Sequence, residues 1–319
     1  MTELVLIQPT QLYNIINQFS HNAFISNPHY MVLFDVRTKE DYDEAHIVLA
    51  RRLKKNENDS FVLPYEINLE CRWNVIVYDG CTTSLDQSSD AIKAGKFLYS
   101  SGSRKSVNIL QGGYELFSRL YPFLRTQKVL YLPRELEQFS TYPLEVIPGF
   151  LYLSSRAEAN NHKMHREMKI TAHLNSDLDH DPIYGNCPRS DELSFNVSRD
   201  VTNILPVLNQ ACDFLKKKHF EGSRVLIVSE RCVSRNVAFA IAYLIKYNGM
   251  SLQDAWRHLK DVCLPMQPTW DFMQQLAQFE ANCRGREEIC GLTEEEFYGK
   301  RMRQFRIESQ IRSALPKND

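Results

Sequence analysis

The stretch from Arg224 to Ile245, RVLIVSERCVSRNVAFAIAYLI, contains residues whose types and order suit the binding of a phosphate group. An apolar run that predicts a buried strand leads into a short polar loop, and a run of small apolar residues that predicts a helix follows. N–H groups at the start of a helix attract an anion, and an arginine can bond two phosphate oxygens. Ser229, Ser234 and Arg235 are therefore candidate phosphate-binding residues, and Cys232 is the only thiol of this loop.

A second loop with possible chemistry follows the apolar run of residues 73–79. That run ends in Asp79, and Cys81 lies two residues further on. The pair His162 and His165 has a spacing found in metal sites, but no second cluster in the sequence completes a tetrahedral set of ligands. We therefore expect no metal and no cofactor.

Two stretches of alternating strand-like and helix-like sequence are predicted to position these loops. In the first, strands suited to the inside of a parallel sheet are predicted at residues 30–37, 73–79 and 106–113, with a helix between the last two. In the second, strands are predicted at 150–155, 170–176 and 224–229, and helices at 204–220, 236–249, 252–261 and 268–283. The predicted fold class is α/β with two domains, over residues 1–127 and 142–283. A linker is predicted over residues 128–141, and a charged tail, helical or partly disordered, over residues 284–319.

The composition of the 319-residue chain limits its partners and its location. The net charge of −1 gives no basic field for nucleic acid or for an anionic membrane. No apolar run approaches the ~20 residues that span a bilayer, and the N-terminal sequence lacks the features of a secretory signal. The eight cysteines include no C-x-x-C pair, which favours reduced thiols. A cytoplasmic location is predicted, with a mitochondrial location as the alternative.

The first predicted domain resembles the rhodanese-like domain, in the three-layer α/β form that is fused to MAP-kinase phosphatases. The residues that carry the resemblance are Asp35, Arg37, Tyr42, His46, Ile47, Gly112, Gly113, Phe117 and Pro122. Active members of that family place a cysteine directly after the second strand, where this chain has Asp79. The resemblance therefore implies that sulfur transfer is absent. We interpret Cys81 as an ordinary loop thiol rather than as a displaced nucleophile.

A basic segment follows shortly after His46. In MAP-kinase phosphatases, a basic and apolar motif near this point docks an acidic groove of the kinase. Here the segment LARRLKK, residues 49–55, supplies four candidate docking residues, which are Arg51, Arg52, Lys54 and Lys55. Arginines pair with carboxylates, and flanking leucines can fill apolar pockets. A solvated loop without a docking role is the alternative.

The second predicted domain resembles the dual-specificity phosphatase domain, whose loop has the pattern His-Cys-x5-Arg. The thiolate of that loop attacks phosphorus. Counting back six residues from Arg235 gives Ser229 at the nucleophile position and Val228 at the histidine position. Cys232 falls at the loop glycine, and Asn236 replaces the hydroxyl residue that assists the leaving thiolate. A serine hydroxyl is far less acidic than a thiol and has no adjacent base here, so the resemblance implies an inactive site.

The general acid of that family also has no clear counterpart. It is an aspartate about thirty residues before the nucleophile, and it protonates the leaving oxygen. In this chain Val197 or Ser198 occupies the position, and Asp200 is the nearest carboxylate. We interpret Asp200 as the N-cap of the helix predicted at 204–220, with a role as the acid left as the alternative.

The pairing of two degenerate domains resembles the MAP-kinase-phosphatase-like members of the STYX pseudophosphatases, the serine/threonine/tyrosine-interacting-like type. The resemblance implies a catalytically inactive binding or scaffold protein that regulates phospho-signalling. Its expected partners are proteins: phosphoproteins, kinases or active phosphatases, with a mitochondrial phosphatase or stress-granule proteins included. Nucleic acid and membrane are not expected partners. The alternatives are a weakly active phosphatase that uses Ser229 or an unorthodox thiol, and residual sulfur transfer by Cys81.

Overall fold

The computed structural model describes residues 3–19, 23–130, 132–176, 191–195, 203–230, 232, 234–289, 291–293 and 296–297. Contacts divide the chain into two compact units. The first comprises Met1–Tyr152, Asn161–Lys169 and Val262–Pro265. The second comprises Leu153–Asn160, Ile170–Asp261 and Met266–Asp319. The predicted linker and domain limits remain predictions.

A five-stranded parallel sheet in the order β1-β8-β7-β2-β4 is the centre of the first unit. Its strands are β1 (Leu4–Ile7), β2 (Met31–Asp35), β4 (Ala50–Arg52), β7 (Asn74–Tyr78) and β8 (Val107–Leu110). The strands predicted from apolar runs at 30–37, 73–79 and 106–113 are confirmed as β2, β7 and β8. These central strands are apolar on both faces because a parallel sheet is covered on both sides.

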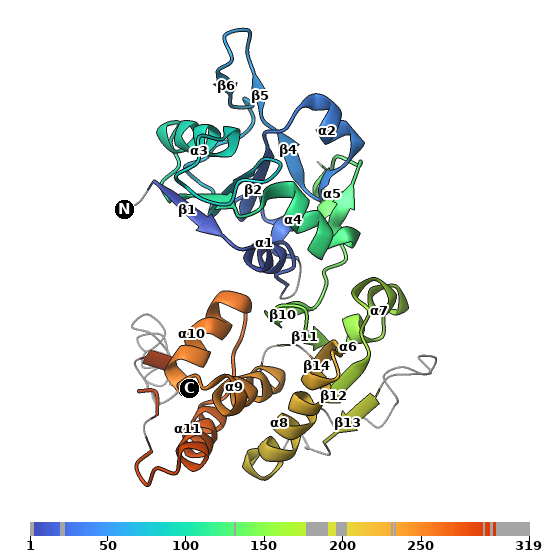
Figure 1. The fold of residues 1–319 in the computed structure, drawn as a ribbon, viewed down its shortest axis with the longest axis vertical. Helices are drawn as coiled ribbons and strands as arrows, with labels where there is room; N and C mark the ends of the chain where they lie inside the picture. Colours follow the sequence, from blue (N-terminus) through green and yellow to red (C-terminus); the bar gives the residue numbers. More distant parts are fainter. Residues whose placement is uncertain are drawn as a thin grey trace, which may run out of the picture. The chain divides into compact units, whose positions relative to one another are not determined.

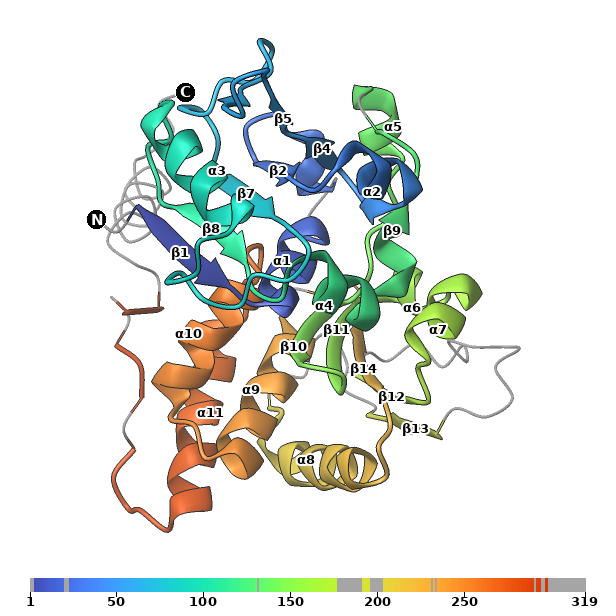
Figure 2. The ribbon, with the colours of Figure 1, turned by 45° about the horizontal axis from the view of Figure 1, so that its top comes forward.

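The helices near the first sheet in the sequence are α1 (Pro9–Ile16), α2 (Lys39–Glu44), α3 (Asp90–Ser100), α4 (Gly113–Leu120) and the short α5 (Pro133–Glu137). Helix α3, predicted between the second and third strands, lies against the sheet in Figure 2. Its small residues Ala91 and Ala94 pack with Val75, Val77 and Ile109 in one buried cluster.

Four short strands of the first unit lie outside its five-stranded sheet. β3 (His46–Ile47) pairs antiparallel with β9 (Arg125–Thr126), and β5 (Lys54–Lys55) pairs with β6 (Phe61–Val62). The β5–β6 hairpin projects from the rest of its unit in Figure 1. It carries part of the basic segment 49–55.

Helix α1 is tied to residues more than a hundred positions away in the sequence. The hydroxyl of Tyr13 donates to the carbonyl of Pro143 at 2.7 Å. The side-chain amide of Asn14 donates to the carbonyl of Glu145 and accepts from its N–H, both at 2.8 Å. The carboxylate of Glu145, itself buried, accepts from the hydroxyl of Tyr152 at 2.8 Å. These bonds satisfy buried polar groups, so β10 (Leu144–Ile147) is held within the first unit.

The second sheet has the order β10-β11-β14-β12-β13. Its further strands are β11 (Leu151–Ser155), β12 (Ala172–Asn175), β13 (Asp191–Ser194) and β14 (Val225–Ser229), and β12 runs parallel to both β13 and β14. The predicted strands at 150–155, 170–176 and 224–229 are confirmed as β11, β12 and β14.

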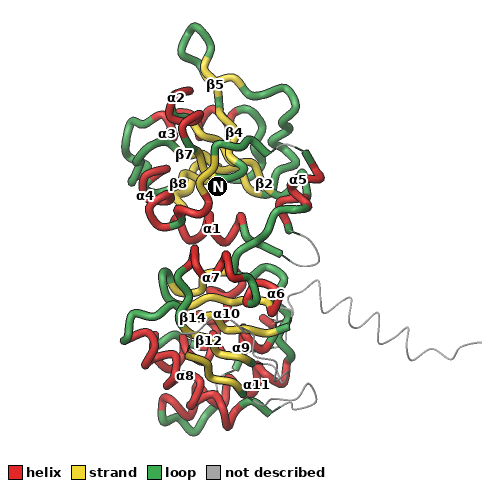
Figure 3. The backbone as a smooth tube through the Cα atoms, turned by 90° about the vertical axis from the view of Figure 1, so that its right-hand side faces the viewer, coloured by secondary structure: helices red, strands yellow, loops and turns green. Residues whose placement is uncertain are grey.

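The helices of this part of the chain are α6 (Arg156–Ala159), α7 (His162–Met168), α8 (Leu205–Phe220), α9 (Arg235–Asn248), α10 (Leu252–Val262) and α11 (Trp270–Arg284). Four of them match the predicted helices closely. Helix α9 is buried along almost its whole length, and α8 and α11 pack on it (Figure 3). Because it is covered on several sides, α9 needs small and apolar residues all round rather than one apolar stripe.

None of the helices in the described residues is long and apolar enough to cross a membrane. Most of the predicted charged tail, from residue 298 onward, lies outside the described residues.

Candidate functional sites in the two units

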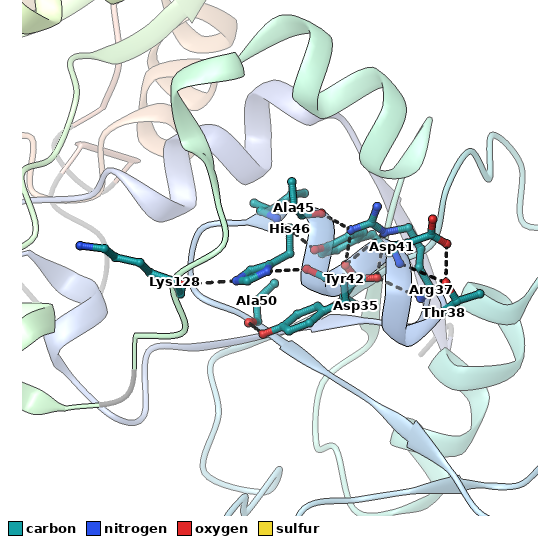
Figure 4. Close-up of polar contacts among 11 residues, drawn as sticks. Asp35, Arg37, Thr38, Asp41, Tyr42, Ala45, His46, Ala50 and Lys128 are labelled. Atoms are coloured by element: carbon teal, nitrogen blue, oxygen red, sulfur yellow. Dashed lines mark hydrogen bonds and ion pairs between the residues drawn. The ribbon is translucent and has the colours of Figure 1, made fainter.

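The Asp-x-Arg pair at the end of β2 forms a buried ion pair. The guanidinium of Arg37 donates to both carboxylate oxygens of Asp35, at 2.7 and 3.1 Å, and also to the carbonyl of Ala45 at 2.8 Å (Figure 4). Asp35 is fully buried, and a buried carboxylate needs a partner of this kind. The ion pair fixes the chain that leads from β2 into and out of α2.

Tyr42 and His46 extend this bonded framework. The hydroxyl of Tyr42 donates to the carbonyl of Ala50 at 2.8 Å, and Nδ1 of His46 lies 2.9 Å from the carbonyl oxygen of Tyr42. The two rings stack with their centroids 4.0 Å apart. Figure 4 shows the ring of His46 directed toward the main chain at Lys128. The motif therefore holds α2, β4 and the chain after β9 together.

Asp79, the residue after β7, holds the loop that follows it. One carboxylate oxygen accepts from the N–H groups of Cys81 and Thr82, at 3.2 and 2.9 Å. The other accepts from the hydroxyl of Thr82 at 2.5 Å and from the N–H of Ala91, in the first turn of α3, at 3.4 Å. A carboxylate thus fills the group of amide donors that such a loop offers to an anion.

The paired glycines after β8 let α4 approach this loop closely. Gly113 has φ of 53°, and a Cβ there would lie 2.4 Å from the carbonyl oxygen of Asp79. The N–H groups of Tyr114 and Glu115 donate to the carbonyls of Asp79 and Gly80, at 2.8 and 3.0 Å. Glycine is therefore required by both backbone conformation and space.

A cavity of about 720 Å³ opens beside the loop. Its lining includes Arg37, Arg52, Lys55, Asp79, Tyr114 and Arg125. Cys81 also lines it and is an exposed free thiol. The sequence interpretation did not single out Tyr114 or Arg125. In the sequence, Tyr114 and Arg125 stand out only because they are close to the paired glycines and to Pro122.

The predicted docking residues do not share one surface. Arg51 and Arg52 are neighbours on β4, where successive side chains point to opposite faces. Arg51 lines a pocket of about 230 Å³ together with Arg72, whereas Arg52 lines the larger cavity.

The lysines and leucines of the segment also differ in their exposure and in their contacts. Lys55 forms ion pairs with Asp59 and Asp90, each at 3.0 Å, while Lys54 is exposed. Leu53 is 2% exposed and belongs to the buried cluster, so it cannot fill a pocket of a partner. Lys54 and the partly exposed Arg51 remain as the docking candidates of this segment.

The loop after β14 carries the predicted nucleophile position. Ser229 is the last residue of β14 and is buried, and its hydroxyl oxygen accepts from the N–H of Cys232 at 3.1 Å. Val228, at the expected histidine position, is fully buried. Its carbonyl accepts from the N–H and the hydroxyl of Ser176, at 3.0 and 2.8 Å. No imidazole stands at the position before Ser229.

Cys232 occupies a backbone conformation that favours glycine. Its φ of 56° is left-handed, and for a residue with a Cβ this conformation costs about 1–2 kcal/mol. The side-chain amide of the fully buried Asn236 donates to its sulfur at 3.0 Å. The thiol is thus bonded to the first turn of α9, and Cys232 comes three residues after the nucleophile position.

Arg235 is the first residue of α9, and Ser234 is its N-cap. The arginine therefore stands at the positive end of a buried helix, which is the arrangement that attracts a phosphate. Glu230, directly after Ser229, is an exposed carboxylate that opposes an anion there. Asp200, Val197 and Ser198 lie outside the described residues. In the part of the chain that is described, no group of three or more His, Cys, Asp and Glu residues could hold a metal ion.

Comparisons with known proteins also divide the chain into two domains. Residues 151–282 match the family "Dual specificity phosphatase, catalytic domain", and residues 16–120 match the family "Rhodanese-like domain". The chain is 26% identical over 289 residues to Dual specificity protein phosphatase 16 of Homo sapiens, which covers 82% of this chain and 42% of that protein. It is 26% identical over 270 residues to Dual specificity protein phosphatase 1-A of Xenopus laevis, with 73% of this chain and 71% of that protein covered.

A solved structure, that of human DUSP28, is similar at a TM-score of 0.42 and 24% identity, covering 46% of this chain and 97% of that one. The chain spans less than half the length of the human phosphatase 16 that it matches. The predicted α/β fold, with a rhodanese-like domain before a dual-specificity phosphatase domain, is confirmed.

Proposed function

We propose that this chain, which carries a rhodanese-like and a dual-specificity phosphatase domain, is a pseudophosphatase that regulates phospho-signalling by binding other proteins. The observation that carries the proposal is the identity of the residues at the end of β14. A hydroxyl, that of Ser229, stands where the phosphatase loop needs a thiolate, and its oxygen accepts an N–H of its own loop. The relatives named above are phosphatases by name. The phosphatase loop that the sequence resembles has a cysteine at the position of Ser229.

The other thiol of the loop does not replace the missing nucleophile. Cys232 is three residues from Ser229, in a left-handed turn, and its sulfur accepts a hydrogen bond from Asn236. A nucleophile must lie in line with the phosphorus and below the ring of loop amides. In the proposal, Cys232 has no part in catalysis.

The rhodanese-like domain is proposed to be inactive for a related reason. Sulfur transfer needs a thiol at the position of Asp79, held among loop amides. Here the carboxylate of Asp79 takes up those amides itself. The domain then serves as a binding module. Lys54 and Arg51 are its candidate contacts with an acidic surface of a kinase or another protein.

Phosphate binding can survive the loss of the nucleophile. It needs donors and a helix N-terminus, and Arg235 at the start of α9 supplies both. Phosphoproteins, kinases and active phosphatases are therefore the proposed partners, and the cytoplasm is the proposed location.

The test is a titration of a phosphotyrosine or phosphothreonine peptide against the full chain and two arginine variants. Loss of a charge-assisted hydrogen bond costs about 1.5–3 kcal/mol, so Arg235→Ala should weaken binding by about tenfold to a hundredfold. Arg257→Ala is the matched control, because Arg257 is an exposed arginine on α10 of the same unit. Equal binding by wild type and Arg235→Ala would remove the phosphate pocket from the proposal.

A further inference from the structure

A segment beyond the part that matches the phosphatase family packs back on the second unit. The family match ends at residue 282, whereas Leu292 and Phe297 are still buried, at 8% and 9% exposed. Figure 2 shows the chain after α11 returning toward α10. Gly291 lies against α11, since a Cβ there would be 3.3 Å from the Cβ of Ala277. We call this stretch segment 291–297.

The ring of Phe297 holds the segment against two tryptophans. Its centroid lies 5.1 Å from that of Trp256, on α10, and 5.2 Å from that of Trp270, the first residue of α11. Aromatic pairs at this separation attract each other beyond the effect of their buried area. Phe297 therefore covers apolar surface that α10 and α11 would otherwise expose to water.

Thr293 and Glu296 join the segment to itself and to α10 by polar contacts. Oγ1 of Thr293 accepts from the N–H of Glu296 at 3.2 Å and donates to its carboxylate at 3.0 Å. That carboxylate also accepts from the N–H of Thr293 at 2.9 Å and from the side-chain amide of Gln253, on α10, at 3.1 Å. The bonds from Thr293 hold the pKa of Glu296 below its usual value, so this carboxylate is charged at neutral pH.

The sequence that follows Thr293 is acidic. Its next three residues are Glu294, Glu295 and Glu296. Protein kinases select their acceptors partly by charge pattern, and a basic substrate groove fits a threonine that carboxylates follow. Thr293 is exposed, and a short segment at the surface can open locally without unfolding the core of its unit. The hydroxyl is thus accessible to an enzyme of this kind.

We propose that Thr293 is a phosphorylation site for a protein kinase that selects acidic residues after its acceptor, and that phosphorylation releases Phe297 from the two tryptophans. In this step Oγ1 forms a bond to the γ-phosphorus of ATP, and the bond from that phosphorus to the ADP oxygen breaks. The hydroxyl proton passes to a base of the kinase. The phosphate then carries a charge of about −1.5 to −2 at neutral pH.

Two effects of this phosphate oppose each other, and the repulsive one is larger. The N–H groups at the start of a helical turn attract an anion, but they act as only about half a positive charge. The three glutamates carry three negative charges within the next three residues. In addition, the esterified oxygen has no hydrogen left to donate to Glu296. Displacement of Glu296 also removes its contact with Gln253, so the segment loses its polar contact with α10.

The first test incubates the full chain with ATP and a casein-kinase-type kinase, which selects acidic residues after its acceptor, and locates the phosphate by mass spectrometry. Ser251 is the internal comparison, because its hydroxyl donates to Asp254 in the same kind of cap. Ser251 precedes the 11-residue helix α10, which must unwind before a kinase can act. Thr293 should therefore be phosphorylated faster by about tenfold or more. Equal rates, or no phosphate at Thr293, would overturn the site.

The second test measures hydrogen exchange of the phosphorylated chain in peptides that cover residues 291–297 and α10. Exchange in the first peptide should speed up by about tenfold or more, while peptides of α8 stay unchanged. Phe297→Ala is the matched variant. Its segment should exchange faster without phosphate, and phosphorylation should then add less than about twofold. Unchanged or slower exchange in phosphorylated wild type would refute the release, and an equal further increase in Phe297→Ala would overturn the role given to Phe297.

Discussion

Replacement of Asp79 should loosen the loop after β7 and the start of α3 together. The carboxylate accepts three bonds at 2.5–3.2 Å from Cys81 and Thr82 and a longer one from Ala91. Hydrogen bonds to a charged group contribute about 1.5–3 kcal/mol each, and the low end applies because this loop is only half-buried. Water can replace part of what is lost. We therefore expect Asp79→Ala to destabilise the first unit by about 2–4 kcal/mol.

A more conservative substitution keeps the shape of the side chain and removes its charge. In Asp79→Asn the amide oxygen can still accept from the N–H groups of Cys81 and Thr82, but the NH₂ group faces the N–H of Ala91. The expected loss is about 1–2 kcal/mol, roughly half that of the alanine variant. Asp86→Ala is the matched control, because that carboxylate is exposed in the same loop and accepts from the hydroxyl of Ser84 only at 3.3 Å.

Hydrogen exchange read by mass spectrometry on peptides that cover residues 80–92 is the assay. Protection there should fall in the order wild type, Asp79→Asn, Asp79→Ala, while peptides of β14 and α9 remain unchanged. The reasoning is refuted if Asp79→Ala exchanges no faster than Asp86→Ala.

Three further predictions concern other parts of the chain. Gly113→Ala should lower the thermal unfolding midpoint by more than Gly149→Ala. Both glycines have positive φ, but only a Cβ at Gly113 would meet backbone within 3 Å. Equal losses would contradict this. The hydrogen bond with Lys246 holds the pKa of Asp213 below its usual value. The stability that this ion pair gives to the fold is therefore present above the unfolded pKa of ~3.9, and it is lost as pH falls through the lower folded pKa. Asp213→Asn should thus be less stable by at most ~1 kcal/mol at neutral pH, and the difference should vanish in urea unfolding below both pKa values; a difference that persists in acid would refute the ion-pair account. Burial raises the pKa of the Cys212 thiol to about 12, so iodoacetamide at pH ~8 should modify the exposed thiols at positions 71 and 81 long before Cys212, and equal rates would contradict its burial.

The elements that carry the sites could be predicted because their signals are local. The apolar runs at 73–79 and 224–229 are β7 and β14, and the small-residue run after Arg235 is α9. The offset between Ser229 and Arg235 is also a local property. The six-residue offset can be counted once the predicted strand and helix mark the two ends of the loop.

The contacts that give these residues their roles could not be predicted, because their partners are distant in sequence. The bond between Asp79 and the N–H of Ala91 depends on where α3 begins, twelve residues later. Asn14 finds its partner at Glu145 after 131 residues. The basic segment 49–55 looked like one docking surface, but the alternation of β4 sends Arg51 and Arg52 to different faces, and Leu53 joins the core. The sequence pattern shows that this segment is basic, whereas the direction of each of its side chains depends on tertiary packing.

The most direct test of the central claim is the hydrolysis of p-nitrophenyl phosphate by the purified full chain, beside Ser229→Ala and the double variant Val228→His/Ser229→Cys. We predict no turnover above a buffer blank for wild type and Ser229→Ala. Measurable turnover should appear in the double variant, because it places a thiolate at the end of β14, six residues before Arg235 at the start of α9. If the double variant folds but stays inactive, Cys232→Gly added to it should release the strained turn. Turnover by wild type that Ser229→Ala abolishes would contradict the account.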